Sequence, residues 1–423
     1  MSNTQKTQRV IDAIQKDLDD GKLSQRKIAL KHNVGRDFVS SVKRGVAKAL
    51  INDPKNIQPK ADPTNEKILK LEAQVISLQD ETRRSQQAYK AAQRENGVFE
   101  ALVDEMKNTI HPIKPFSRLP KVQKDSQKIR ESLVMHLSDE HADSVVLPHQ
   151  VGGLERYDLR IALRRAEVYV ETILRFTQET LSEYVFNDLY ILAHGDHISG
   201  EIHQATDHSF YRNSFKNALI VGQMHAFMFR DLCAYFPRVH VLYLSGNHGR
   251  RSVKKDYHQP HNNWDYLVAE VARLHCADLS NVDFNIPDSY SACLDIDGYG
   301  FAVSHGDDIR SWNGIPWYGI ERKTRRWAAL NAAVDRKINY YCFGHFHQAA
   351  TQAALNGEII LNGAWVACDP YVFNSLTAFT EPSQWIHGVH HRHGVSWRLN
   401  IKLRSEREHL GPKRYSHILG ALQ

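Results

Sequence analysis

Five short polar segments of this 423-residue chain combine carboxylate, amide and imidazole side chains at spacings that let neighbouring side chains share one cation. In chain order they are Asp139-Glu140-His141, Gly195-Asp196, Gly246-Asn247-His248, His305-Gly306 and Gly344-His345-Phe346-His347. Oxygen and imidazole ligands together suit Mn, Fe or Zn, whereas Mg prefers oxygen alone. Any one of these segments is common by chance, but the ordered set of five predicts a metal site.

Each segment follows an apolar run that predicts a buried strand. The five runs are Ser132–Leu137, Asp188–Ala193, Val239–Tyr243, Gly300–Val303 and Ile338–Phe343. Amphipathic helices are predicted from Tyr157 to Leu174 and from Asn213 to Tyr235, between the first three strands. Alternating strands and helices predict a layered α/β domain, in which the site lies at the carboxyl ends of the strands.

Further elements are predicted toward the C-terminus. They are a hairpin around Asp297-Gly298, a basic helix from Glu321 to Val334, and strands at Glu358–Leu361 and Val395–Leu403. Four histidines also gather near Gly394, namely His387, His390, His391 and His393. We expect this histidine cluster to lie on a surface loop, although binding of phosphate or metal is an alternative.

The five polar segments resemble, in content and order, those of the calcineurin-like metallophosphoesterase superfamily over roughly residues 130 to 403. The motif order looks most like that of the DNA-repair exonuclease branch. The resemblance implies an α/β fold with a four-layer αββα sandwich and a two-metal site at one edge. It also implies a metal-dependent phosphoesterase, a hydrolase in which a metal-bound hydroxide attacks the phosphoester.

Carried over residue by residue, the resemblance assigns seven metal ligands, with the Asp196 carboxylate bridging two ions. One ion is assigned to Asp139, His141, Asp196 and His347, and the other to Asp196, Asn247, His305 and His345. His248 is not a ligand in this assignment; it contacts the scissile phosphate and assists the leaving oxygen. As the free imidazole of the set, His248 fits a general acid.

The chain departs from the family directly after His248, where members commonly carry an acidic residue that helps to orient this imidazole. Gly249, Arg250 and Arg251 follow instead. The family's way of orienting His248 therefore does not apply to this chain. Arg250 and Arg251 are predicted to bind a neighbouring phosphate of the substrate, which favours a polynucleotide over a small monoester.

Residues 1 to 50 predict a small helical unit that resembles a helix-turn-helix DNA-binding module. Apolar residues recur at helical spacing up to Gly21, Ser24 can cap a second helix, and a third begins at Arg36 after a turn. The residues predicted to contact DNA from the third helix are Arg36, Ser40, Lys43 and Arg44. The alternative is a three-helix bundle whose charges are merely solvated.

The segment between this unit and the metal-binding part contains two predicted linkers and a long helix. Prolines mark linkers at 51–66 and 111–129, and a heptad repeat of apolar residues at 67–110 predicts a coiled coil. Such a coiled coil would make a homodimer and pair two DNA-binding units. The alternative is a long helix that folds back on the metallophosphoesterase domain, which is predicted to span 130–423.

Composition limits the protein class. The charge is mixed, with a formal excess of +6, and histidine occurs 24 times. Five widely separated cysteines suggest neither a disulfide framework nor a thiolate zinc site, which favours a reducing cytoplasm. The N-terminal residues lack the apolar core of a secretory signal, and no run is long and apolar enough to cross a bilayer, so no membrane partner is expected.

Basic residues near the metal-binding segments favour a polyanionic substrate. They form two groups, Arg250, Arg251, Lys254 and Lys255 after the third strand, and Arg322, Lys323, Arg325 and Arg326 on the basic helix. Together with the N-terminal unit they predict a Mn-dependent DNA phosphodiesterase, a nuclease of DNA processing or repair. The alternatives are a phosphomonoesterase acting on protein or nucleotide, and a DNA-binding regulator with a scaffold phosphoesterase domain.

Overall fold

The computed structural model describes residues 3–45, 128–202, 205–309, 315–354 and 356–420. The chain forms two compact units, Met1–Ala101 and Leu102–Gln423. The predicted linker at 51–66, the predicted coiled coil at 67–110 with its homodimer contact, and nearly all of the predicted linker at 111–129 lie outside the described residues.

Three helices make up the described part of the N-terminal unit, and they lie where the sequence predicts them. They are α1 (Asn3–Asp19), α2 (Gln25–Lys31) and α3 (Arg36–Lys43). Their apolar faces meet in a small core in which Ile14, Ile28 and Val39 are fully buried. Ser24 occupies the position before α2, but its side chain makes no capping hydrogen bond, so helix packing rather than this cap stabilises α2.

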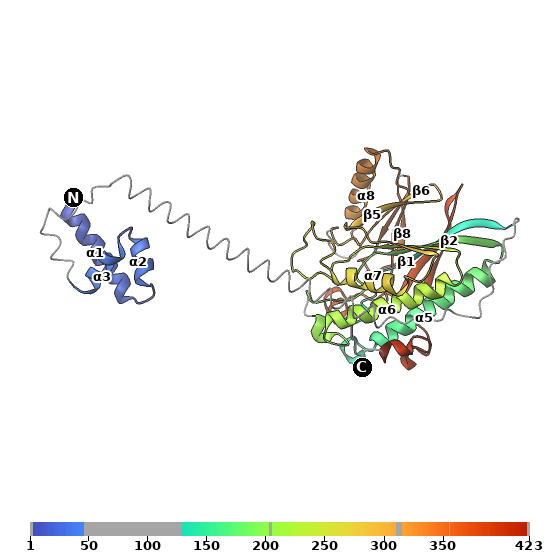
Figure 1. Cartoon of the computed structure of the whole chain (residues 1–423), viewed down its shortest axis with the longest axis horizontal. Coiled ribbons are helices and arrows are strands. Elements are labelled where there is room, and N and C mark those ends of the chain that lie inside the picture. Colours follow the sequence, from blue (N-terminus) through green and yellow to red (C-terminus); the bar gives the residue numbers. More distant parts are fainter. Residues whose placement is uncertain (1–2, 46–127, 203–204, 310–314, 355, 421–423) are drawn as a thin grey trace. The chain divides into compact units, whose positions relative to one another are not determined.

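A six-stranded sheet organises the C-terminal unit (Figure 1). Its order is β11 (Gly394–Lys402), β10 (Ser383–His390), β1 (Ile129–Leu137), β2 (Tyr184–Ala193), β3 (Arg238–Tyr243) and β4 (Val282–Asn285). Strands β1 to β4 are parallel, and β10 pairs antiparallel with β1. The carboxyl ends of three neighbouring parallel strands, β1, β2 and β3, therefore meet at one edge of the sheet.

Three helices connect these parallel strands and pack on one face of the sheet (Figure 1). They are α5 (Leu159–Arg175), α6 (Ser214–Cys233) and α7 (Trp264–His275). Each has a polar residue at its start whose side chain accepts backbone N–H hydrogen bonds: Asp158, Asn213 and Asn263. Their apolar faces join the sheet residues Leu133, Ile191 and Val241 in the largest core.

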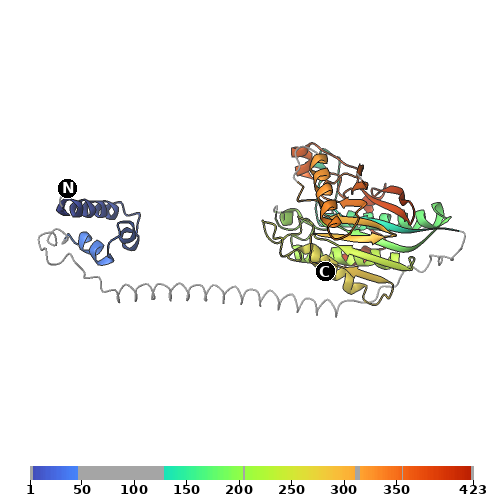
Figure 2. The same ribbon diagram turned by 90° about the horizontal axis from the view of Figure 1, so that it is seen from above.

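A second sheet of five strands packs against the other face of the first (Figure 2). Its order is β5 (Ser291–Ile296), β6 (Tyr299–Ser304), β7 (Tyr340–Phe343), β9 (Gly357–Leu361) and β8 (Ala350–Ala354). Val134 and Leu192 of the first sheet meet Phe301 and Cys342 of the second in a shared core. Helix α8 (Trp317–Ala332) packs on the second sheet through Ile320. No described helix has the length and apolarity needed to cross a membrane.

The prediction that the four histidines lie on a surface loop is wrong for the first two of them, which belong to strand β10. His387 belongs to β10 and is only 1% exposed, with its ring stacked on Phe301. Strand β10 escapes detection because Ser383–His390 is rich in polar residues although it pairs on both sides. His391 and His393 lie at the exposed turn after β10, as predicted. Strand β11 coincides with the closing strand predicted at Val395–Leu403.

Candidate metal centre

The predicted ligands follow the ends of five strands drawn from both sheets. Asp139 follows β1, Asp196 follows β2 and Asn247 follows β3, all at the carboxyl edge of the first sheet. His305 follows β6, and His345 and His347 follow β7. Since β6 and β7 are parallel neighbours in the second sheet, their ends also meet at one edge. The fold thereby brings polar segments from distant parts of the sequence to one place.

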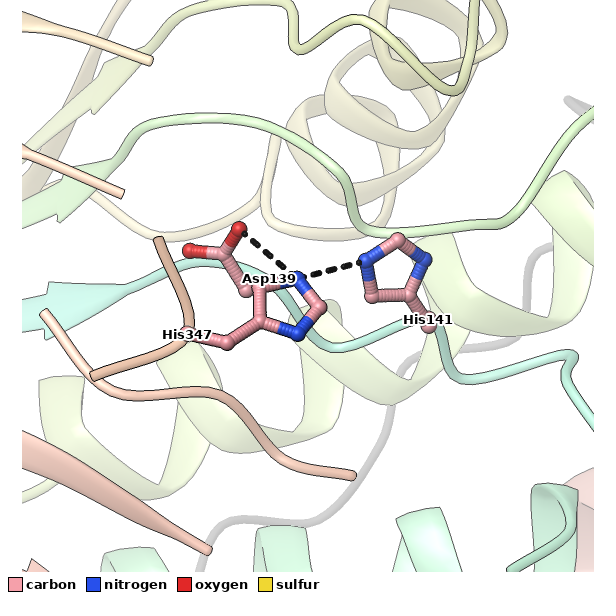
Figure 3. A group of neighbouring side chains, drawn as sticks. All are labelled: Asp139, His141 and His347. Atoms are coloured by element: carbon pink, nitrogen blue, oxygen red, sulfur yellow. Dashed lines mark hydrogen bonds and ion pairs between the residues drawn. The ribbon is translucent and has the colours of Figure 1, made fainter. Parts of the chain in front are cut away.

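The first group of side chains consists of Asp139, His141 and His347 (Figure 3). The Nε2 atoms of His141 and His347 face each other at 3.2 Å, and Asp139 Oδ1 lies 3.5 Å from His347 Nε2. Two imidazole nitrogens and a carboxylate oxygen that converge in this way form a suitable donor set for a transition-metal cation.

The second group consists of Asp196, His305 and His345, with Asn247 beside it. His305 Nε2 lies 2.9 Å from Asp196 Oδ2 and 3.0 Å from Asn247 Oδ1. The other ring nitrogen, Nδ1, donates to the backbone carbonyl oxygen of His194 at 2.9 Å. A hydrogen bond of this kind fixes the ring and directs its second nitrogen toward the metal position.

Asp196 belongs to the second group and lies next to His141 of the first. Its carboxylate lies within 4.8 Å of ligand atoms of His141 and His248, and equally of His305 and His345. Oδ1 accepts a hydrogen bond from the His248 backbone N–H at 2.7 Å. Oδ2 is buried and, apart from the ion pair with His305, has no hydrogen-bond partner among the described residues. A buried carboxylate oxygen with so few partners is a good acceptor for a cation, so the residues fit divalent-metal binding.

Burial sets the protonation of the metal-free site. It raises the pKa of Asp139 to about 7 and lowers the pKa of His345 and His347 to about 4. Burial also lowers the pKa of His305, but the Asp196 charge outweighs it and raises that pKa to about 10. Without a cation, a proton on His305 therefore balances the Asp196 carboxylate.

Five predicted ligands adopt the left-handed backbone conformation, which residues other than glycine rarely adopt. Their φ angles are 54° at Asp139, 43° at His141, 56° at Asp196, 66° at His345 and 56° at His347. They make up half of the ten non-glycine residues with positive φ in the described part of the chain. Strain of this kind persists where the surroundings impose it, and it concentrates at functional sites.

Two glycines allow the ligand loops to approach each other. A Cβ atom at Gly246 would lie 2.1 Å from Asp196 Oδ1, and one at Gly344 would lie 2.5 Å from Asp139 Oδ2. A side chain at either position would displace a ligand carboxylate, because contacts this short do not occur. The glycines of the two predicted motifs thus have a steric role that their spacing alone does not reveal.

Asp265 is a functional residue that sequence reasoning missed. Its buried carboxylate accepts three backbone N–H hydrogen bonds, from Asp196 at 3.0 Å, His197 at 3.1 Å and Gly246 at 2.8 Å. It therefore ties the loop after β2 to the loop after β3. The available signal was Asn263, a helix-capping residue type two positions before Asp265, at the start of the unpredicted helix α7.

The departure from the family pattern after His248 has a structural counterpart. A Cβ atom at Gly249 would meet Asn263 Oδ1 at 2.1 Å and Asp265 Cγ at 3.2 Å. The start of α7 already fills the space in which a side chain after His248 would begin. His248 is held instead by its backbone bond to Asp196 and by the edge of its ring against the His141 ring, with centroids 4.7 Å apart.

A second buried cluster lies directly behind the ligands. Glu140 accepts hydrogen bonds from His197 Nδ1 at 2.9 Å and from His225 Nε2 at 2.7 Å. Burial favours protonation of Glu140, but His225 and His197 outweigh it and lower its pKa to about 2. Through His225 the cluster ties the Asp139–His141 loop to α6.

The structure also locates the predicted substrate-binding and DNA-binding residues. Arg250 is half-buried and Arg251 is exposed, with the Arg251 guanidinium 5.5 Å from the Trp264 ring. In the N-terminal unit Arg36, Lys43 and Arg44 are exposed. Ser40 is half-buried, and its hydroxyl donates to Gln25 at 3.3 Å, so this serine is less accessible than predicted.

Comparisons with known proteins give only remote likenesses. No family model matches the chain, and no curated protein matches it. Among solved structures, the chain is similar to vacuolar protein sorting 29 of Cryptosporidium parvum at 13% identity and a TM-score of 0.29, over 62% of this chain and 86% of that one. An archaeal phosphodiesterase aligns at 11% identity and a TM-score of 0.30, over 64% and 99% of the two chains.

A third likeness is to a Streptococcus pneumoniae protein described as a predicted phosphoesterase, at 8% identity and a TM-score of 0.25, over 64% and 98% of the chains. The chain's own arrangement of two sheets, covering helices and clustered histidines and carboxylates agrees with the α/β fold and the metal site that the sequence predicts.

Proposed function

We propose that this protein is a nuclease, a phosphodiesterase that uses two divalent transition-metal ions to cleave DNA. Mn is the expected metal, with Fe or Zn as alternatives. The observation that carries the proposal is the position of Asp196 between two groups of ligands, one with His141 and one with His305 and His345. A shared carboxylate between two mixed oxygen and nitrogen donor sets is suited to a pair of ions.

The metal ions and His248 would have different roles in the reaction. Two ions bound there would supply Lewis acidity toward a phosphodiester and lower the pKa of water. His248 is half-buried beside Asp196 and is the imidazole that the assignment leaves free of metal. Its backbone bond to Asp196 and its ring contact with His141 hold it facing the centre, where it can protonate a leaving oxygen.

DNA as the substrate is supported by the N-terminal unit. Helix α3 exposes Arg36 and Lys43, Arg44 follows its last residue, and none of these three forms an ion pair within the described residues. Unpaired basic side chains on one short helix suit contacts with phosphates. We infer that this unit brings the phosphodiesterase to DNA, as a step in DNA processing or repair requires.

An activity screen tests the proposal. Full-length protein loaded with Mn is incubated with DNA, RNA, a phosphopeptide and a mononucleotide, in parallel with His248→Ala. We expect DNA cleavage that EDTA abolishes, and a loss of turnover of about 10²- to 10⁴-fold in His248→Ala with unchanged metal content. A matched control is His409→Ala, a histidine of the C-terminal segment outside the centre.

Two results would replace this function with another. Intact DNA together with His248-dependent hydrolysis of the phosphopeptide or mononucleotide would make the protein a phosphomonoesterase. Binding of DNA without hydrolysis of any substrate by the metal-loaded protein would make it a DNA-binding regulator whose phosphoesterase domain is a scaffold.

A further inference from the structure

The loop after His305 is held by two lysines from separate basic segments. Lys255, in the loop that follows His248, lies 2.7 Å from Asp307. Lys323, on α8, lies 2.5 Å from Asp308 and donates to the Ser304 hydroxyl at 3.2 Å. Since Ser304 to Asp308 includes the ligand His305, both basic segments are anchored next to the metal centre.

Beyond these anchors, both segments present further positive charge to solvent. Arg251 and Lys254 are exposed in the first segment, and Arg322 and Arg326 are exposed on α8. The lysines that hold the loop are already matched by acidic partners. Lys254, Arg322 and Arg326 have no ion-pair partner among the described residues, so the surface beside the centre carries an excess of positive charge.

Exposed tyrosines are interleaved with these charges. Tyr257 is 70% exposed and Tyr318 is 78% exposed. Tyr318, Arg322 and Arg326 recur every four residues, which places them along one face of α8. The Tyr257 ring also lies edge-on to Tyr290, with centroids 6.2 Å apart, and Lys255 is 4.2 Å from the Tyr290 ring.

This combination suits a strand of nucleic acid whose bases are not paired. Basic side chains follow a phosphate backbone, and aromatic rings stack on successive bases regardless of sequence. A duplex offers its phosphates to such a surface but keeps its bases stacked inside. The arginines alone would serve either substrate, whereas the rings of the exposed tyrosines can stack only on unpaired bases.

We propose that the 250–258 loop and the exposed face of α8 form a binding track for single-stranded nucleic acid that leads to the metal centre. This inference rests on the proposed function, because the track delivers the substrate of that site. It selects a single strand, or a single-stranded end of a duplex, over an intact duplex.

A binding experiment in EDTA tests the track without any cleavage. Full-length protein is titrated into fluorescein-labelled DNA of about 20 nucleotides, either single-stranded or as a blunt duplex, and anisotropy is followed. The double variant Tyr257→Ala/Tyr318→Ala should weaken single-strand binding by about tenfold or more and leave duplex binding within about twofold of the wild type. Circular dichroism verifies that the variant is folded.

Charge is tested separately with Arg322→Ala/Arg326→Ala. This variant should lower the slope of log affinity against log salt for the single strand by about 0.7 for each phosphate that the protein no longer neutralises. Arg175→Ala is the control. Arg175 is exposed at the end of α5, and the chain continues from there to the start of β2, whereas the metal centre lies at the carboxyl end of that strand. It should bind both DNAs as the wild type does.

The outcomes separate this inference from the proposed function. Single-strand binding that survives both double variants would overturn the track, as would equal losses for single strand and duplex in the tyrosine variant. Mn-loaded wild-type protein is assayed for cleavage in parallel. A protein that cleaves no nucleic acid would refute the nuclease, while a tyrosine-dependent preference for single strands in EDTA would still establish the track.

Discussion

The Asp265 carboxylate accepts a hydrogen bond from the Asp196 backbone N–H at 3.0 Å, which links the first turn of α7 to the central carboxylate of the metal site. The same Asp265 oxygen accepts the Gly246 N–H at 2.8 Å. Two loops that carry predicted metal ligands, Asp196 and Asn247, thus share one anchor. That anchor lies outside every segment in which the ligands themselves are found.

Replacing this anchor should weaken metal binding without removing a ligand. Asp265→Asn exchanges one acceptor oxygen for an amide group and leaves buried N–H groups unsatisfied, at about 1 to 3 kcal/mol each. We expect Mn affinity, measured by calorimetric titration, to fall by about 10- to 100-fold. Asp288→Asn, whose side chain is 69% exposed, is the control. Unchanged Mn affinity in Asp265→Asn would show that other contacts hold the loops.

Gly246→Ala should remove metal binding by steric displacement. The added methyl group would lie 2.1 Å from Asp196 Oδ1, so the carboxylate has to move away from its present position. Gly420→Ala is a matched control, since its nearest neighbour would be 3.6 Å away. Bound metal, measured by elemental analysis after dialysis, should be lost only in Gly246→Ala. A fully loaded Gly246→Ala protein would contradict the observed packing.

Metal binding should release protons at neutral pH. In the metal-free protein His305, with a pKa of about 10, is protonated at pH 7, and Asp139, with a pKa of about 7, is partly protonated. A cation replaces these protons, so apparent Mn affinity should rise as pH increases from 6 toward 8. Calorimetry in buffers of different ionisation enthalpy measures the protons released. An affinity that does not vary with pH would contradict this protonation pattern.

The same His305 pKa has a consequence for folding stability. Because it is raised in the folded state, the His305–Asp196 pair stabilises the metal-free protein fully below the ordinary histidine pKa. This contribution is lost as pH rises through about 10. Thermal unfolding in EDTA should therefore show a decline in Tm toward alkaline pH that is smaller in His305→Ala.

The N-terminal unit should contribute affinity for DNA but no chemistry. Arg36→Ala/Lys43→Ala should weaken duplex binding and lower its salt slope by about 0.9 for each phosphate left without its basic partner. Lys22→Ala is the control, because Lys22 is exposed and already paired with Asp20. Hydrolysis of a small diester at saturating concentration should not change. Wild-type DNA affinity in the double variant would remove this unit from DNA recognition.

The convergence of the candidate ligands was predictable because each follows a strand that the sequence predicts. Asp139 and Asp196 are each in the second or third position after a strand that is recognisable from its sequence. Parallel strands bring such positions together without any knowledge of the loops. The sequence therefore predicted which candidate ligands come together, although the distances between them required the fold.

Asp265 and the β10 strand were not predictable for two different reasons. Asp265 acts through backbone N–H groups, and its partners at Asp196 and Gly246 are 69 and 19 positions away. Strand β10 lacks a regular alternation of polar and apolar residues. It buries polar side chains that have specific hydrogen-bond partners; Gln384, for example, donates to the Gly363 carbonyl oxygen at 2.6 Å. Contacts of this kind have no periodic signature along the chain.

The left-handed backbone at five predicted ligand positions would favour glycine there if the side chains had no function. Such a conformation costs about 1 kcal/mol or more for each non-glycine residue, so the five together cost about 5 kcal/mol, the lower end of a domain's net stability. Glycine would adopt the same angles without that cost. In a lineage that had ceased to bind cations, glycine at these positions would remove this backbone cost. Aspartate or histidine stands at all five positions, as expected of a site that is still in use.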